Sequence, residues 1–133
     1  MSSASIATVA RIIPAPRFET RAAALGEDKM YRHRLYQQVI YGHFNEFLKA
    51  NDELNAIARK KGWPESKIWT PVVGTGNDAV LETEYADLAT FERVNHAFQS
   101  DPESMKIFRG TASVVVQGSV HDELFEQVIR PLA

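Results

Sequence analysis

Apolar and polar residues alternate along residues 30–40, which is the pattern of a β-strand with two different faces. One face carries the residues at positions 31, 33, 35, 37 and 39, which are mostly apolar but include a histidine and a glutamine. The opposite face carries Arg32, Arg34, Tyr36, Gln38 and Ile40. Because neither face is purely apolar, we expect a helix to cover one side of this strand and a semi-polar surface to lie on the other.

The periodicity changes after Gly42, where apolar residues begin to recur at helical spacing from Phe44 to Ala58. Three cations at positions 59–61 follow, where they complement the dipole at the end of a helix, and Gly62 is a typical helix stop. The pattern predicts a helix over residues 44–61.

A strand–turn–strand pattern follows the helix. Residues 67–73 predict a strand at a sheet edge, because Pro71 has no N–H to donate to a neighbouring strand. Residues 74–78 contain two glycines, an asparagine and an aspartate, which is typical of a hairpin connection. Residues 79–85 alternate again and predict the returning strand.

Two helix starts come next. Asp87 is a good N-cap for a helix to about residue 99, and Asp101 followed by Pro102 predicts another start. We expect this second helix to continue past Gly110 as far as Gly118; the alternative is a strand over residues 112–116. Residues 120–129 predict the last strand.

The order of these elements is β-α-β-β-α-α-β, which predicts an α+β, ferredoxin-like fold over residues 30–133. We expect a four-stranded antiparallel sheet with its helices on one face. We also expect the first strand to lie next to the third and parallel to it.

Residues 1–29 form a separate N-terminal extension in this interpretation. The apolar run at residues 6–13 ends at Pro14 and Pro16, which favours a short arm docked on the domain. The alternative is a transit peptide, because the segment has three arginines, several serines and alanines, and a single acid before residue 26.

Composition narrows the classes of function. The 133 residues fit one domain, with 44% hydrophobic and 24% charged residues, as in ordinary soluble proteins. The net charge of −2 provides no field for sequence-independent nucleic-acid binding, and no apolar run approaches the roughly 20 residues that span a membrane. The absence of cysteine excludes disulfides and thiolate nucleophiles and fits a reducing compartment. We expect a cytoplasmic location, with organellar targeting by the N-terminal segment as the open alternative.

The sheet face without helices carries a prediction of its own. It would combine Tyr36, Ile40, Val80 and half of the strand that contains Trp69 with several charged residues. Apolar surface of this extent usually marks an interface. We therefore expect a symmetric homodimer in which two sheets pack across a partly polar cavity. The alternative is a monomer whose open face is screened by the N-terminal arm.

Two segments resemble NIPSNAP-like proteins. They are residues 42–48, Gly-His-Phe-Asn-Glu-Phe-Leu after a strand, and residues 84–88, Glu-Tyr-Ala-Asp-Leu, followed by Phe91-Glu92-Arg93. The resemblance covers about residues 30–131 and departs from the NIPSNAP pattern in the first strand. It implies the dimeric α+β-barrel superfamily, which includes small cofactor-free monooxygenases and muconolactone isomerase-like enzymes.

The candidate pocket lies on the open face. If the first strand neighbours the third, Arg34 lies beside Glu82 or Glu84, with Tyr36 and Gln38 on the same face. In a functional interpretation these groups anchor a small ligand, with Tyr36 as donor and a glutamate as base. In the structural interpretation, which we favour, they form a ladder of salt bridges that specifies the dimer. The pocket candidates are Arg34, Tyr36, Gln38, Trp69, Glu82 and Glu84.

The histidines at positions 33, 43, 96 and 121 have no metal-ligand spacing, so we expect no metal site and no cofactor. We expect His33 to pack under a helix and His96 to be a partly buried histidine rather than a pocket acid or base. The leading interpretation is a homodimer that binds a small apolar or aromatic molecule. One alternative is a cofactor-independent monooxygenase or isomerase for an aromatic or lactone substrate, and the other is a structural or interaction module without catalysis.

Overall fold

The computed structural model describes residues 29–130. The predicted N-terminal arm of residues 1–29, and the alternative transit peptide, lie outside the described residues except for Lys29. Along the described chain the elements are β1 (Tyr31–Gln38), α3 (Phe44–Lys61), β2 (Lys67–Trp69), β3 (Asp78–Tyr85), α4 (Leu88–Gln99), α5 (Pro102–Gly110), a 3₁₀ turn (Thr111–Ser113) and β4 (His121–Glu126).

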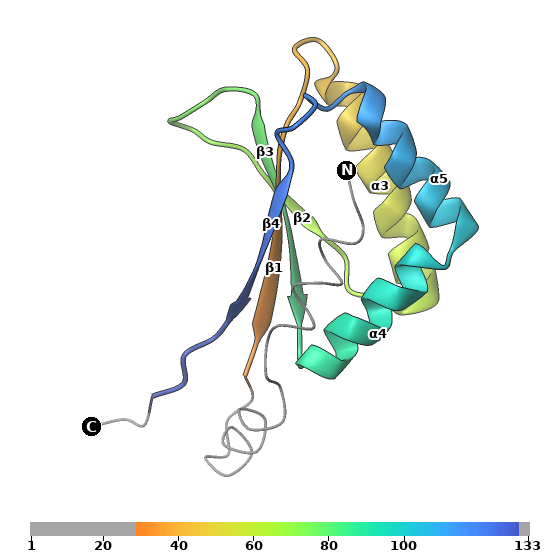
Figure 1. Ribbon diagram of the computed structural model, residues 1–133, viewed down its shortest axis with the longest axis vertical. Coiled ribbons are helices and arrows are strands. Elements are labelled where there is room, and N and C mark those ends of the chain that lie inside the picture. Colours follow the sequence, from red (N-terminus) through yellow and green to blue (C-terminus); the bar gives the residue numbers. More distant parts are fainter. Residues whose placement is uncertain (1–28, 131–133) are drawn as a thin grey trace.

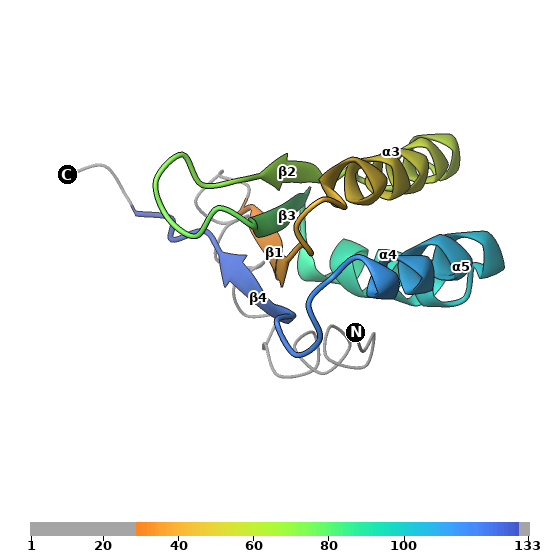
Figure 2. The same ribbon diagram turned by 90° about the horizontal axis from the view of Figure 1, so that it is seen from above.

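The four strands form one sheet in the order β2-β3-β1-β4, and all neighbouring pairs are antiparallel. Helices α3, α4 and α5 lie on the same side of this sheet, as Figure 1 and Figure 2 show, and within residues 29–130 the opposite side carries no helix. The predicted α+β, ferredoxin-like fold is therefore confirmed.

One detail of the predicted topology was wrong. β3 lies next to β1, as expected, but runs antiparallel to it, with Tyr31 opposite Tyr85 and Gln38 opposite Asp78. The reason is that α3 returns the chain so that β2 runs in the direction of β1, and the hairpin then reverses it once more.

The helix ends lie where the local signals placed them. Gly62 closes α3 in the left-handed conformation, with φ of 74°, and its N–H bonds back to the last turn. Asp87 and Asp101 cap α4 and α5 by accepting hydrogen bonds from the backbone N–H groups of Thr90 and Ser104. Hydrogen bonds from Ser104, and then from Lys61 at the end of α3, lower the pKa of Asp101 to about 2.

The predicted continuation of the second helix to residue 118 was wrong. α5 ends at Gly110, a 3₁₀ turn follows, and Val115 forms an isolated antiparallel bridge with Val39. Gly110 weakens the helix, and the β-branched residues 114–116 find hydrogen bonds at the end of β1, where the N–H of Ile40 donates to the carbonyl of Val114. The alternative strand over residues 112–116 is likewise reduced to this single bridge.

The outer strands are shorter than predicted. β2 ends at Trp69 and β4 at Glu126, rather than at residues 73 and 129. Pro71 removes a backbone donor two residues after Trp69, and β2 is an edge strand, as expected.

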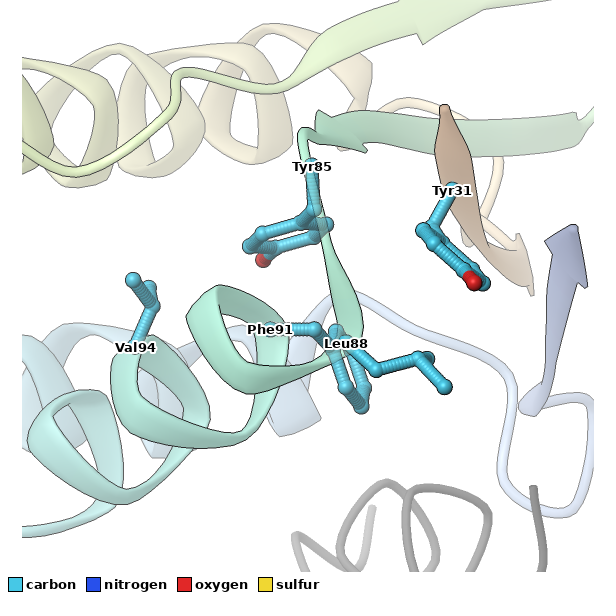
Figure 3. Close-up of a cluster of buried hydrophobic side chains, with 5 residues drawn as sticks. All are labelled: Tyr31, Tyr85, Leu88, Phe91 and Val94. Carbon is cyan, nitrogen blue, oxygen red and sulfur yellow. The ribbon is translucent and has the colours of Figure 1, made fainter. Parts of the chain in front are cut away.

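The core lies between the sheet and the helices. Tyr31 and Tyr85 from the strands pack against Leu88, Phe91 and Val94 from α4, as drawn in Figure 3. Burial raises the pKa of the Tyr85 hydroxyl to about 12. At the other end of the sheet a second cluster contains Val39, Phe47, Ala79, Val114 and Val115. Within residues 29–130 none of the helices has both the length and the apolar character needed to cross a bilayer.

Candidate functional site

The strand register brings all six predicted pocket residues to the uncovered face of the sheet. On this face Arg34 lies opposite Glu82, Tyr36 opposite Val80, and Gln38 opposite Asp78. Trp69 of β2 lies on the other side of Val80. Glu84 lies opposite Arg32, so that Arg34 has Glu82, rather than Glu84, as its neighbour.

Two adjoining hollows lie on this face, and we call them together the sheet-face groove. They share Tyr36, Trp69 and Val80, and their volumes are about 530 and 320 Å³. Gln38 lines the larger hollow, whereas Arg34 and Glu82 line the smaller one. Glu84 lines neither, so five of the six predicted residues meet at the groove.

A ladder of charges forms one wall of the groove. Arg34 Nε donates to Glu82 Oε2 at 3.1 Å, and Arg32 Nη2 donates to Glu84 Oε1 at 2.6 Å. Arg32 Nε also lies 3.5 Å from Glu82 Oε1, so that both oxygens of Glu82 face a guanidinium group. The Glu82 side chain is 9% exposed and that of Glu84 43%, which makes Glu82 the inner member of the ladder.

Arg34 is held from several sides. Hydrogen bonds to Tyr36, and then to Glu82, raise its pKa above the ordinary arginine value. Its guanidinium carbon also lies 5.0 Å from the ring centre of Phe125 on β4, which is a cation–π contact. These contacts fix a cation next to the groove, where it can bind a carboxylate, a phenolate or a polarised carbonyl group.

The structure adds three residues that were not nominated from the sequence. The His121 ring stacks on the Tyr36 ring with centres 4.6 Å apart and planes 2° apart, and Gln38 Nε2 donates to Asp78 Oδ1 at 3.2 Å. Arg32 completes the ladder. Alternation in the first strand already placed Arg32 on this face, whereas His121 and Asp78 required the register of the neighbouring strands.

Large apolar side chains remain exposed around the groove. Trp69 is 53% exposed and Phe125 44%, and both lie on the uncovered face. Val72 and Val73, in the loop between β2 and β3, are almost fully exposed. Figure 1 shows this loop projecting on the side of the sheet that has no helices.

The other histidines have no part in the groove. His33 is buried on the helix side of the sheet, as expected, with its ring 5.7 Å from that of Phe91. The prediction of a partly buried His96 was wrong, because its side chain is 59% exposed on α4 with Glu92 as its charged neighbour. Over residues 29–130 no three histidine, aspartate or glutamate residues gather as metal ligands.

The crossover helices, the strand order and the uncovered face define the ferredoxin-like α+β class. No family model and no curated protein sequence matches the chain. Solved structures do match it. An uncharacterized NIPSNAP-like domain protein from Burkholderia xenovorans aligns with a TM-score of 0.61 and 15% identity, over 78% of this chain and 91% of that one.

A NIPSNAP family protein from Agrobacterium tumefaciens aligns with a TM-score of 0.59 and 14% identity, over 72% of this chain and 90% of that one. A putative antibiotic biosynthesis monooxygenase from Nitrosomonas europaea aligns with a TM-score of 0.59 and 12% identity, over 77% of this chain and 93% of that one. At these identities the likeness shows a common fold. The resemblance to NIPSNAP-like proteins, inferred from two short segments, is confirmed at that level.

Proposed function

We propose that two copies of this chain pack their uncovered sheet faces together and that the sheet-face groove binds a small apolar or aromatic molecule. The observation that carries the proposal is the exposure of Trp69 and Phe125 beside a groove of several hundred Å³. In a monomer these rings stay exposed to water, which does not stabilise the protein. Burial of an aromatic side chain on association is strongly favourable.

The polar groups on the face support pairing of two sheets rather than simple burial. Charged side chains are costly in an interface unless they are paired, and here both arginines already have carboxylate partners on the same face. The arginine–glutamate pairs can therefore be buried in a dimer interface without leaving an unpaired charge. The groove between Tyr36, Trp69 and Val80 would then become an enclosed space with an apolar floor and Arg34 at its edge.

The test of dimerisation is the mass of the full chain in solution. We expect native mass spectrometry and analytical ultracentrifugation at micromolar concentration to give twice the chain mass. A monomer over this concentration range contradicts the proposal. The alternative, in which residues 1–29 screen this face, leaves no room for a dimer and predicts that monomer.

The test of ligand binding uses the two tryptophans of the chain separately. Trp69 lines the groove, whereas Trp63 does not. In a Trp63→Phe variant, Trp69 is the only fluorescent tryptophan, and we expect 1-nitronaphthalene, a quencher with two fused rings, to quench it along a saturating curve. The matched Trp69→Phe variant should show only linear, collisional quenching of Trp63. Linear quenching of both would remove the groove as a binding site for small aromatics.

A catalytic version of the proposal has one observation in its favour, the stacking of Tyr36 on His121 within the groove. In this version the stacked Tyr36 is the proton donor and Glu82, the buried carboxylate of the smaller hollow, is the base, with Arg34 as a fixed cation beside them. A cofactor-independent monooxygenase or isomerase needs little more from the protein than such a base and a dry pocket. The test is oxygen uptake with an electron-rich dihydroxyaromatic probe.

Glu82→Gln separates this enzyme from a structural module. In an enzyme that uses Glu82 the variant loses oxygen uptake and remains a dimer. If the arginine–glutamate ladder serves only to specify the interface, the variant weakens the dimer and no uptake is found in either protein. Glu84→Gln is the matched control, because Glu84 has the same partner Arg32 but lies outside the groove.

A further inference from the structure

A second cavity lies on the opposite side of the sheet, between its inner face and helices α3, α4 and α5. Its volume is about 120 Å³, and most of its lining is apolar. An engineered apolar cavity of about 150 Å³ in another protein binds benzene, so this space is of the size of one aromatic ring. We call it the interior cavity, and it shares no lining residue with the sheet-face groove.

Aromatic side chains make up much of its wall. Phe98 packs edge-to-face against Phe108 with centres 5.6 Å apart and against Trp63 at 6.5 Å. Phe91 and Tyr85, drawn in Figure 3, contact each other in the same way at 5.1 Å and line the cavity too. Aromatic rings prefer such edge-to-face and offset arrangements, so this lining favours a guest that is itself a flat ring.

One polar group in the lining has no partner among the residues that the structure describes. Asn95 on α4 is 7% exposed, and its side-chain amide makes no hydrogen bond to any residue of the 29–130 range. The other two asparagines of the lining are satisfied: Asn51 donates to the carbonyl of Phe47, and Asn55 exchanges two bonds with the backbone of Ser66. A buried amide without a partner is costly, and native proteins rarely keep one without a reason.

A second polar group lines the same space. His33 on β1 is buried, and its Nε2 lies 3.4 Å from Asp122 Oδ2 on β4. The Asp122 side chain is 4% exposed, so the pair is shielded from solvent. A carboxylate in this position orients the imidazole ring. The interior cavity thus combines an aromatic wall with an unpaired amide and an oriented histidine.

We propose that the interior cavity binds a small neutral molecule with one aromatic ring and one hydroxyl group, with the Asn95 amide as its polar anchor. A hydroxyl group can both donate to Asn95 Oδ1 and accept from Asn95 Nδ2, which suits an amide that has neither partner. A charged guest is excluded by the cost of bringing its charge into an apolar space without a counter-ion. This site does not depend on the dimer or on the sheet-face groove.

The experiment compares phenol with toluene, in which a methyl group replaces the hydroxyl. Binding is followed by NMR on the ¹⁵N-labelled full chain, through the side-chain signals of Asn95 and of both tryptophans. We expect phenol to shift the signals of Asn95 and Trp63 along a saturating curve, whether or not the signal of Trp69 in the sheet-face groove also shifts. Shifts confined to Trp69 would assign phenol to the sheet-face groove and overturn this proposal, while leaving the proposed function standing.

Asn95→Leu tests the anchor, because leucine has a similar size and no polar group. We expect it to weaken phenol binding at least fivefold and to leave toluene binding unchanged or tighter. Asn45→Leu, an exposed asparagine on α3 away from the cavity, is the matched control and should alter neither ligand. Equal changes for phenol and toluene in Asn95→Leu would remove the amide as anchor.

A readout on the unaltered protein covers the case in which Asn95→Leu does not fold. Nuclear Overhauser contacts between phenol ring protons and the rings of Phe91, Phe98 or Phe108 are then expected. Their absence at saturating phenol, or the absence of any saturating shift, overturns the proposal.

Discussion

At the scale of single residues, the surroundings of two buried ionisable side chains contribute to the stability of the fold. Tyr85 lies in the core cluster and the inner carboxylate Glu82 lies in the charge ladder. Each has an exposed counterpart of the same type, Tyr41 and Glu84, which provides a control. The consequences differ because one group is disfavoured when ionised and the other is held by opposite charges.

The Tyr85 hydroxyl makes stability fall in alkali. Its pKa is about 12 in the folded protein, because burial disfavours the phenolate, and about 10 in the unfolded chain. Below pH 10 both states are protonated and the contribution is fully present. Between pH 10 and 12 the unfolded chain loses the proton first, so unfolding becomes easier by about 2 kcal/mol.

Urea unfolding between about pH 9 and pH 12 measures this effect, because this interval spans the pKa of Tyr85 in the unfolded and in the folded chain. We expect Tyr85→Phe to flatten the decline, although it removes a hydroxyl and changes packing slightly at neutral pH. Tyr41→Phe, at a position that is 77% exposed, should leave the decline as in the wild type. An unchanged decline in Tyr85→Phe would assign the alkaline loss to other groups.

Glu82→Gln should lower stability more than Glu84→Gln. Glu82 faces both arginines with its side chain 9% exposed, whereas Glu84 bonds only Arg32 and is 43% exposed. We expect a loss of about 1–2 kcal/mol for Glu82→Gln and less than about 0.5 kcal/mol for Glu84→Gln. Chemical denaturation of the two variants at the same protein concentration measures the loss in free energy of unfolding. Equal losses would show that Glu82 contributes no more to stability than the exposed Glu84.

At the scale of elements, the local signals set the helix starts correctly and failed where a helix end depended on a distant strand. Asp87, Asp101 and Gly62 act within one turn of their own helix, so their neighbours in sequence suffice to predict them. The end of α5 depends on Val115 meeting Val39, which is a contact between segments far apart in the chain.

The cap of α4 can be tested by substitution. Asp87→Ala removes the acceptor for the Thr90 N–H, at 2.6 Å, and we expect a loss of about 1 kcal/mol in the free energy of unfolding. Asp87→Ser keeps a side-chain acceptor and should recover most of the free energy of unfolding that Asp87→Ala loses. The hydrogen bond to Thr90 also lowers the pKa of Asp87, so its contribution is present above the ordinary aspartate pKa and is lost as the pH falls through the lowered value.

Thermal unfolding of the wild type, Asp87→Ala and Asp87→Ser at about pH 7 and about pH 3, on either side of the ordinary aspartate pKa, measures the contribution of the cap. The difference between wild type and Asp87→Ala should shrink at the lower pH, because protonation of Asp87 weakens the cap. A difference that is independent of pH would show that the cap acts without its charge.

At the scale of the whole molecule, the uncovered sheet face determines whether the chain is a monomer or a dimer in this proposal. Trp69→Glu puts a charge into the proposed interface, and we expect it to convert the dimer into a folded monomer with unchanged far-ultraviolet circular dichroism. Ala89→Glu adds the same charge at an exposed position of α4, on the other side of the sheet, and should remain dimeric. Sedimentation of both variants measures the difference, and a dimeric Trp69→Glu would place the interface elsewhere.

The candidate site was predictable in part. Strict alternation assigned Arg34, Tyr36 and Gln38 to one face before any partner was known, because side chains in a strand point to opposite sides in turn. It could not choose between Glu82 and Glu84 as the partner of Arg34, since that choice depends on the register between strands. The same limit hid His121, which meets Tyr36 across β1 and β4.

The sequence by itself determined the order of the elements, the faces of the strands and the helix caps, because each follows from residues within a few positions of one another. Only the tertiary structure decided the antiparallel direction of β3 beside β1, the end of α5 and the contents of the two cavities. Asn95 illustrates the difference. Its place on α4 follows from helical spacing, but whether its amide finds a partner depends on every element packed around it.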